Sequence, residues 1–323
     1  MSQYPFKTRE YGPNAKGTTL TWQDLDYSLL FLSESIDSAN NDILSGSNYL
    51  FVKADGTPSQ NATELSASYV QAKASSPSAT NRISILASPG KYTFASNFTL
   101  DTQYIDVVSI TGECDVLVTG SGTIQVTAND VYVRGINVDV KNFLVTASLP
   151  LLKVKNCKGG DYSFGGYPPP AVGAFVFPGY TIASTFIDCV GGDYSFAGNG
   201  SAYGSFTNCV GGDYSFGSYC DGTFINCTAG DYSFAYGADI EGGKLQNCTA
   251  GDYSFATIGN IISGATLNNC IGGLDSFAQG INSITGTLVG CILTNGSFNT
   301  LNIGLGGQLI ACANGDGSNI TYP

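Results

Sequence analysis

The second half of the chain repeats one short motif, and this repeat limits the possible folds more than any other feature. The motif is Cys-x-Gly-Gly-Asp-Tyr-Ser-Phe, and it decays after residue 270. The motif cysteines follow one another at sequence steps of 32, 20, 18, 21, 22, 21 and 21. A period of about 20 residues is typical of a solenoid, whose short units bury an apolar face only by stacking on their neighbours.

The composition of the unit indicates which kind of solenoid this is. The units are rich in Gly, Ser, Thr and Asn and poor in Leu, Glu and Lys, which disfavours helical repeats. A Leu-x-x-Leu-x-Leu frame is missing, which disfavours a leucine-rich repeat. The sequence therefore predicts a mainly β chain, a single-stranded parallel β-helix with coils of about 20 residues and N-terminal capping or stem helices.

Each unit contains two positions that predict a bend. A large apolar residue stands three positions before each cysteine, and Asn or Asp precedes the cysteine in six copies. Positions −3 and 0 have opposite strand parity, so both can face inward only if the chain bends between them. Asn tolerates the left-handed backbone of such a bend. The expected turn ladder is Asn156, Asp188, Asn208, Asn226, Asn247 and Asn269.

The rest of the motif is expected to form a second bend at Gly-Gly and then a strand. In that strand Phe faces inward, Asp and Ser face water, and Tyr lies inward or at a corner. Stacking the coils then gives ladders of identical residues. The expected core ladder is Cys157, Cys189, Cys209, Cys227, Cys248, Cys270, Cys291 and Cys312 with Phe164, Phe196, Phe216, Phe234, Phe255, Phe277 and Phe298.

Composition excludes several classes of function. The 323 residues are 43% hydrophobic, which allows a large core, and their formal net charge of −12 disfavours nucleic acid or anionic membrane as a partner. Histidine is absent, which removes His-based mechanisms and most zinc sites. The sequence shows no apolar run of membrane-spanning length and no signal-peptide core, so we expect folding in a cytoplasm and no membrane insertion.

The ten cysteines raise the question of disulfides. Eight of them share one register, as small buried apolar residues would, and each would have two equal partners. We therefore expect free buried thiols, no metal and no cofactor, with Cys114 and Cys220 left unassigned.

The chain divides into four expected regions. Residues 1–48 form an arm and a heptad helix, 49–80 a linker with a capping helix over Thr63–Ala74, 81–156 irregular entry coils, and 157–323 the repeat coils, interrupted by a Pro-rich loop at Gly165–Gly179. The heptad helix either lies on a neighbouring domain or forms an oligomeric stem such as a trimer. Its apolar positions are Trp22, Leu25, Leu29, Leu32, Ile36, Ala39 and Ile43.

Two segments resemble known proteins. Asn14–Leu32, with its Lys16-Gly-Thr-Thr-Leu-Thr21 sequence before a helix, resembles the N-terminal segment of bacteriophage tail-fibre and virion proteins. Ile83–Phe94, with its Ser88-Pro-Gly-Lys-Tyr92 turn, looks like the first coil of pectin-lyase-like β-helices of phage tailspikes, and the repeat array is similar to repeats in phage and marine viral proteins. The resemblance implies a virion appendage, in a tail or fibre, that contacts cell-surface glycan or other virion proteins.

Several functions remain open at this point. The first is a structural or adhesive fibre, and the second is a polysaccharide depolymerase that uses Asp and Glu carboxylates. The residues that break the repeat, Cys220, Asp221, Asp239 and Glu241, are its candidates, because catalytic residues should depart from a structural repeat. Calcium binding along the repeat aspartates is weighed against simple bonding to turn amides. The fourth is a filament of coils stacked head to tail, since the C-terminal end shows no capping helix.

Overall fold

The computed structural model describes part of the chain. It covers residues 48–122, 124–138, 144–145, 149–165, 181–198, 200–236, 239–256, 261, 264–277, 283–294, 302–303 and 306–314. The chain divides into two compact units, Met1–Ser47 and Asn48–Pro323, and every described residue belongs to the second. The expected heptad helix from Trp22 to Ile43 lies outside the described residues, as do most of the Pro-rich insertion and Phe298.

The described part is mainly β, and its strands pair in parallel. The largest sheet has 12 strands in the order β1 (Asn48–Val52), β2 (Ile83–Ala87), β5 (Ile105–Ser109), β8 (Tyr132–Arg134), β11 (Lys153–Lys155), β13 (Thr185–Ile187), β15 (Ser205–Thr207), β17 (Thr223–Ile225), β18 (Lys244–Gln246), β19 (Thr266–Asn268), β22 (Thr287–Val289) and β25 (Gln308–Ile310). Each coil of the chain contributes one strand to this sheet, so neighbours in the sheet are successive coils. The expectation of a mainly β chain with parallel strands is confirmed.

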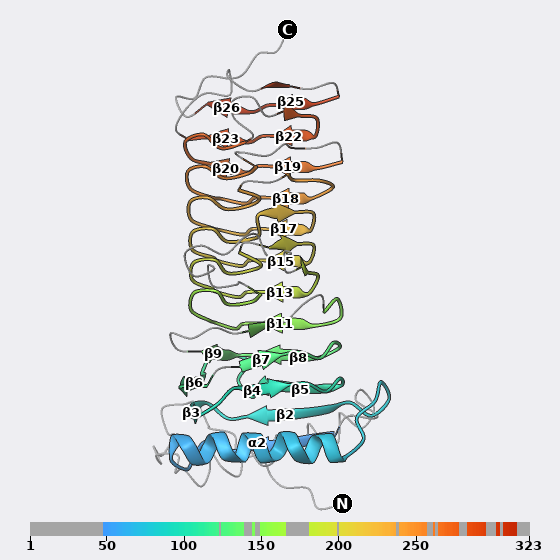
Figure 1. Cartoon of the computed structure of the whole chain (residues 1–323), viewed down its shortest axis with the longest axis vertical. Coiled ribbons are helices and arrows are strands. Elements are labelled where there is room, and N and C mark those ends of the chain that lie inside the picture. Colours follow the sequence, from blue (N-terminus) through green and yellow to red (C-terminus); the bar gives the residue numbers. More distant parts are fainter. Residues whose placement is uncertain are drawn as a thin grey trace, which may run out of the picture. The chain divides into compact units, whose positions relative to one another are not determined.

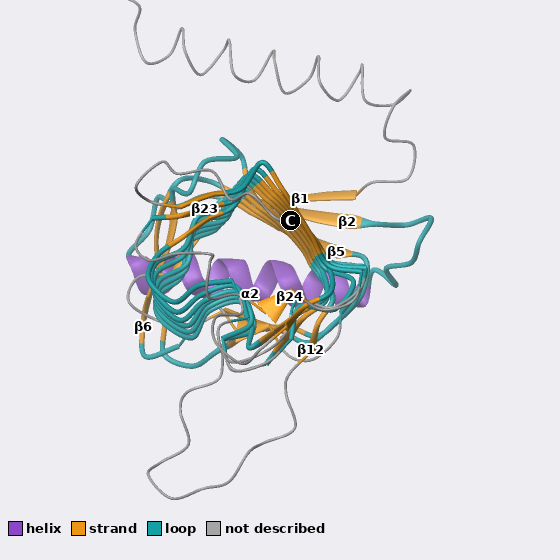
Figure 2. Ribbon diagram, turned by 90° about the horizontal axis from the view of Figure 1, so that it is seen from above, coloured by secondary structure: helices purple, strands orange, loops and turns teal. Residues whose placement is uncertain are grey.

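Smaller parallel sheets line the other sides of the coils. They are β3 (Gly90–Phe94), β6 (Val116–Gly120) and β9 (Ile136–Val138); β4 (Phe98–Leu100), β7 (Ile124–Val126) and β10 (Leu144–Val145); β12 (Thr181–Ile182), β14 (Ser201–Ala202) and β16 (Tyr219–Cys220); β20 (Ile271–Gly272), β23 (Ile292–Leu293) and β26 (Ala313–Asn314); and β21 (Ser283–Ile284) with β24 (Asn302–Ile303). Figure 1 shows the coils stacked along one axis, and Figure 2 shows them superimposed around a common interior. This arrangement is consistent with a parallel β-helix.

A helix covers the N-terminal end of this stack. It is α2 (Pro58–Ala74), which begins at a capping box formed by Thr57 and Gln60. Its buried residues include Leu65, Tyr69 and Ala72, and it packs on β1, β2 and β3. The sequence predicted this helix with its correct C-terminal end but placed its start at Thr63. The Thr57-Pro58 signal, with proline in the first turn, marks the true start.

The segment expected to be a linker contains a strand. Asn48–Val52 pairs in register with Ile83–Ala87, so β1 extends the large sheet by one strand beyond the first expected coil. Tyr49 and Phe51 face outward on this strand. Apolar side chains therefore lie on both of its faces, and the sequence lacks the alternation of apolar and polar residues that would have predicted a strand. The entry coils then follow as β2 to β10, close to the strands expected from the sequence.

Candidate functional site

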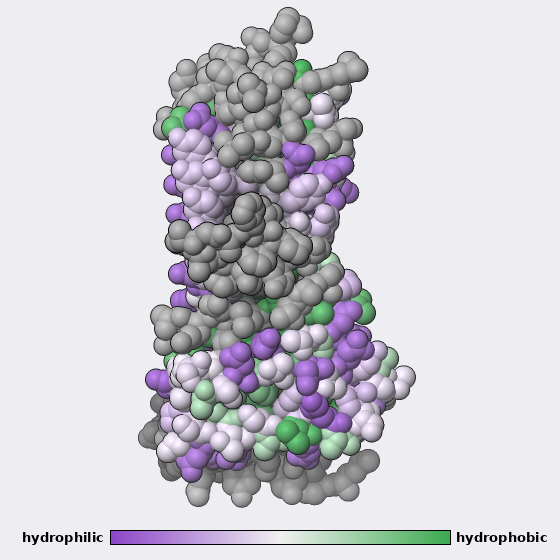
Figure 3. Space-filling view, viewed as in Figure 1, coloured by the Kyte–Doolittle hydropathy of each residue, from purple (hydrophilic) through white to green (hydrophobic). Residues whose placement is uncertain are grey.

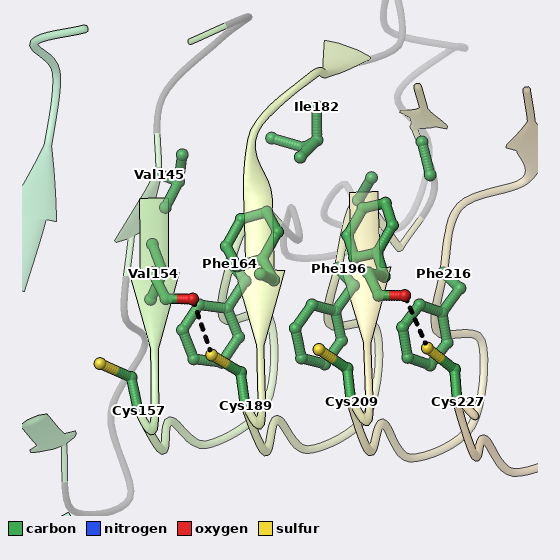
Figure 4. Packing of buried hydrophobic residues seen from close by; sticks show 14 of the residues in the cluster. Val145, Val154, Cys157, Phe164, Ile182, Cys189, Phe196, Cys209, Phe216 and Cys227 are labelled. Carbon is green, nitrogen blue, oxygen red and sulfur yellow. Dashed lines mark hydrogen bonds between the residues drawn. The ribbon is translucent and has the colours of Figure 1, made fainter. Parts of the chain in front are cut away.

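The repeat cysteines line the interior, one above the other. All eight are at most 2% exposed, and Figure 4 shows four of them in a row beside the Phe ladder. Seven of the thiols donate weak hydrogen bonds to the carbonyl of the apolar strand residue one coil earlier, for example Cys227 Sγ to Phe206 O at 3.4 Å. In the entry coils the same register holds Val116 and Ile136. The thiol position is therefore a core position that also accepts aliphatic side chains.

The phenylalanines form a second interior ladder. Phe164, Phe196, Phe216, Phe234, Phe255 and Phe277 are fully buried, and neighbouring rings stack with centroids 4.8 to 5.1 Å apart. This spacing equals the rise of one coil in a stacked sheet. The ring ladder therefore sets the coils in register with one another.

The turn ladder has the left-handed backbone that the sequence predicted. Its six residues have φ between 49° and 54°. Their side chains also bond along the axis, with Asn226 Nδ2 donating to Asn208 Oδ1 at 3.1 Å and Asn247 Nδ2 donating to Asn226 Oδ1 at 3.0 Å. In the last two coils Gly290 and Ala311 take this position with positive φ and without the amide.

The second half of the motif departs from the expectation. It forms tight turns and not a strand, since Tyr194 and Phe196 both have positive φ, as do their repeats. The repeat serines are fully buried, so the expected outward serine is wrong, and the partly exposed tyrosines lie on the outer side. Buried Ser195 Oγ donates to Gly160 O of the preceding coil at 3.5 Å. A serine is tolerated inside because its hydroxyl reaches a carbonyl there.

The repeat aspartates lie on the outer side and bond to the next coil. Asp161 Oδ1 accepts from the backbone N–H of Asp193 at 3.0 Å, and the pattern continues through Asp213, Asp231 and Asp252 to Leu274 N. One oxygen of each carboxylate is therefore engaged in the scaffold. Among the described residues, no group of three or more Cys, Asp or Glu side chains is arranged to hold a metal ion.

A row of stacked tyrosines runs beside the aspartates. Tyr162, Tyr194, Tyr214, Tyr232 and Tyr253 stack with centroids 4.8 to 5.1 Å apart. Tyr236, which is not a repeat residue, packs edge-on against Tyr232 at 4.7 Å. Because the ring faces contact one another, the rings present mainly their edges and hydroxyls outward.

Residues that break the repeat gather on a different side of the coils. The backbone of Cys220 pairs with that of Ile240, so Asp221 and Glu241, each one residue later, lie side by side on adjacent coils. The Tyr219 hydroxyl donates a hydrogen bond to Glu241 Oε2. The Tyr203 ring lies 5.9 Å from the Tyr219 ring and is 43% exposed. Two carboxylates and two aromatic rings thus share one surface site.

The electrostatics of this site act on Asp221 and Tyr219. Partial burial and the neighbouring Glu241 raise the pKa of Asp221 above its usual range. The hydrogen bond to Glu241 raises the pKa of Tyr219, and this bond holds the Glu241 carboxylate in place. A carboxyl with a raised pKa next to a second carboxyl that accepts a hydrogen bond from a hydroxyl is an arrangement that acid–base chemistry can use.

The sequence singled out Asp221 and Glu241 but missed both tyrosines of this site. Cys220, expected to be near the chemistry, is fully buried between Ala202 and Ile240 in the interior. Asp239 is half-buried one residue before Ile240. Tyr203 and Tyr219 could have been found from their place beside the residues that break the repeat, because Tyr219 lies just before Cys220 and Tyr203 just after Ala202, which pairs with Cys220.

A small pocket lies at the junction between entry coils and repeat coils. Its volume is about 250 Å³, and it is lined by Glu113, Cys114, Asn156, Cys157, Lys158, Asp188 and Val190. All ten cysteines are free thiols, and Cys114 is the one that is not fully buried. Burial raises the pKa of Cys114, so its thiol stays protonated at neutral pH and is a weak nucleophile.

The described surface is mainly polar on one face of the coil stack. The face drawn in Figure 3 is mainly hydrophilic over its described residues, and hydrophobic residues show there in small separate groups. Within the described part of the chain, no helix has the length and apolar character needed to cross a bilayer.

Comparison with known proteins gives few matches. No protein-family model matches the sequence, and no curated protein matches it. One solved structure that is similar is ORF18 of Geobacillus virus E2, with a TM-score of 0.47 and 11% sequence identity over 93% of this chain. The chain spans 64% of the length of that structure. A similarity of this size establishes neither a shared fold nor a shared role.

Proposed function

We propose that this chain is a structural and adhesive fibre protein, a phage appendage whose body is a single-stranded parallel β-helix. The observation that carries the proposal is the continuity of its ladders. The Phe rings stack without interruption from Phe164 to Phe277, and the Asp-to-amide bonds run from Asp161 to Leu274. Every coil is thereby tied to the next by core, backbone and surface contacts, as a rigid spacer requires.

The sequence resemblance supports the viral part of this proposal. Asn14–Leu32 resembles the N-terminal segment of phage tail-fibre and virion proteins. Ile83–Phe94, whose sequence looks like the first coil of pectin-lyase-like β-helices, forms β2, a turn and β3. In this proposal residues 1–47 attach or oligomerise the protein, and the repeat coils contact the cell surface. Weak contacts repeated over several copies would supply the adhesion through avidity.

A head-to-tail filament is the weaker alternative. The helix α2 covers the N-terminal end of the stack and buries Leu65 and Tyr69 against it. A second body could stack there only after α2 moved away, which would expose these side chains to water. The proposal therefore favours discrete rods.

A specific observation favours one second function, a polysaccharide depolymerase. Asp221 would act as the general acid, because its pKa is raised, and Glu241 as the base or nucleophile held by Tyr219. Adjacent coils space the backbones of the two residues about 4.8 Å apart along the axis, close to the separation of about 5–5.5 Å between the carboxyl groups of retaining glycosidases. Tyr203 would offer its ring to a sugar.

One experiment separates these functions. The purified full chain is imaged by negative-stain microscopy, and it is then incubated with a panel of bacterial surface polysaccharides. Discrete rods that bind a polysaccharide and release no reducing ends support the fibre, and the 12-stranded sheet predicts a body roughly 55 Å long. Release of reducing ends that is lost in Asp221→Asn and kept in Asp193→Asn supports the depolymerase. Compact particles that bind no polysaccharide would overturn both.

A further inference from the structure

One corner of the repeat coils carries a strip that is uncharged over most of its length and includes several exposed apolar side chains. In each coil from β13 to β26, the residue before the turn residue and the residue after the cysteine face outward on the two sides of the bend. We call these two columns, with the turn residues between them, the corner strip. Of the ten large apolar side chains that are exposed among the described residues, Val190, Val210, Ile292 and Ile310 belong to it, with exposures of 38% to 48%.

The corner strip is also free of charge over most of its length. From Thr207 to Ala313 its positions hold no Asp, Glu, Lys or Arg, although the whole chain has a formal net charge of −12. Asp188, in its first coil, lies 3.9 Å from Lys155 Nζ. The aspartate row lies beyond the next bend. Two copies of this acidic protein could therefore meet along the strip with little like-charge repulsion.

The polar groups of the strip are largely satisfied within the molecule. Asn208, Asn226, Asn247 and Asn269 each donate to the turn residue of the preceding coil at 2.9 to 3.4 Å. The backbone on the far side of the bend pairs in parallel from Lys158 to Ile271. Covering these groups therefore costs less desolvation than covering unpaired amides.

We propose that the corner strip is a lateral contact for a second copy of this chain, lying alongside the first. The argument for a copy is the spacing. The three positions of the strip recur at every coil, about 4.8 Å apart, although their side chains differ between coils. A partner surface stays in register with it over several coils only if it has the same rise, and another coil stack of this chain has that rise.

The size of the strip sets the strength of the contact. Six to seven coils at about 4.8 Å, and a width of about 10 Å, give on the order of 300 Å² per copy. A stable interface covers about 800 Å² per partner. The strip therefore gives association that depends on concentration, and it adds to any contact made by residues 1–47.

The test uses the full chain and places like charges on the strip. Val210→Glu with Ile292→Glu puts two carboxylates on exposed strip positions, and Thr266→Glu with Gln308→Glu puts the same charges on exposed positions of β19 and β25 outside it. In sedimentation velocity we expect wild type to associate, the strip variant to weaken that association by at least about tenfold, and the control to change it little. Wild type that stays monomeric, or an equal loss in both variants, overturns the proposal.

A second measurement covers the case in which residues 1–47 hold the copies together. Val210→Cys and Thr266→Cys each add one exposed thiol, whereas eight of the native cysteines form the buried ladder. Under copper–phenanthroline oxidation we expect interchain disulfides in Val210→Cys and few in Thr266→Cys. An oligomer that gives no cross-link at Val210, or equal cross-linking at both positions, overturns the strip contact.

Discussion

The carboxylate of Asp193 accepts a hydrogen bond from the backbone N–H of Asp213, one coil later, at 2.9 Å. The same relationship repeats in the neighbouring coils, so a residue that looks like a ligand in the sequence serves as an acceptor for the next coil. The carboxylate of Asp193 also explains why the next coil has a glycine at position 212. A Cβ on Gly212 would overlap Asp193 Oδ1. The Asp of one coil therefore leaves no room for a side chain at the second Gly of the motif in the next coil.

We expect Asp231→Ala to destabilise the protein by about 1 kcal/mol, because Asp252 N loses its acceptor, which lies 2.8 Å away. Asp231→Asn keeps an oxygen at the same place and should cost clearly less. Urea denaturation of both variants measures the difference. Equal losses would show that the charge of the aspartate matters, and not the bond.

We expect Gly212→Ala to cost about 1–3 kcal/mol, because the added methyl group overlaps the Asp193 carboxylate. Gly211→Ala is the matched control and should cost less. A methyl group on Gly211 would meet the Ser215 side chain. Two later coils already hold alanine in the register of Gly211, namely Ala229 and Ala250. Beside Ala229 the serine has turned, and Ser233 Oγ donates to Asp231 O of its own coil at 3.2 Å. Thermal denaturation compares the two variants, and a larger loss in Gly211→Ala would contradict this account.

We expect the protein to lose stability in alkali through its buried thiols. Burial raises the pKa of Cys157 from 9.0 to about 12. The unfolded thiol ionises above pH 9 and the folded one does not, so this stabilisation is present below pH 9 and is lost as the pH rises toward 12. The slope is about 1.4 kcal/mol per pH unit for this group.

The matched variant is Cys157→Val, since Val116 and Ile136 fill the same register in the preceding coils. Urea denaturation at pH 8, 9.5 and 10.5 should give a shallower decline for this variant than for wild type. Identical slopes would place the alkaline loss elsewhere in the molecule.

We expect Leu65→Ala to destabilise the protein by about 2–5 kcal/mol, because Leu65 is fully buried between α2 and the first coils. Tyr69→Phe should cost about 1–3 kcal/mol, since the Tyr69 hydroxyl accepts from Asp101 N at 2.8 Å and from Thr102 N at 3.0 Å. Val70→Ala, at a side chain that is 66% exposed, is the control and should change stability by less than about 0.5 kcal/mol. Melting temperatures test all three.

Much of the fold could be predicted because it follows from local chemistry repeated along the chain. The parity of Phe224 and Cys227 requires a bend between them, and Asn226 at φ 54° provides it. The short period of the repeat then forces stacking, and stacking buries the cysteines. The capping helix was predicted over Thr63–Ala74, although its first residue depended on the Thr57 cap.

The tertiary structure alone decided which way the second half of the motif faces. Taken by itself, Asp-Tyr-Ser-Phe alternates like a strand, but Tyr214 and Phe216 adopt positive φ and bring Ser215 inside. That serine finds Gly192 O in the preceding coil, 3.3 Å away, and no sequence rule supplies a partner from another coil. The site of Tyr219, Asp221 and Glu241 arises in the same way. The sequence by itself determined the repeat and its core, because these depend on spacing along the chain. Contacts between coils decided the outer surface, because they depend on which residues the stacking brings together.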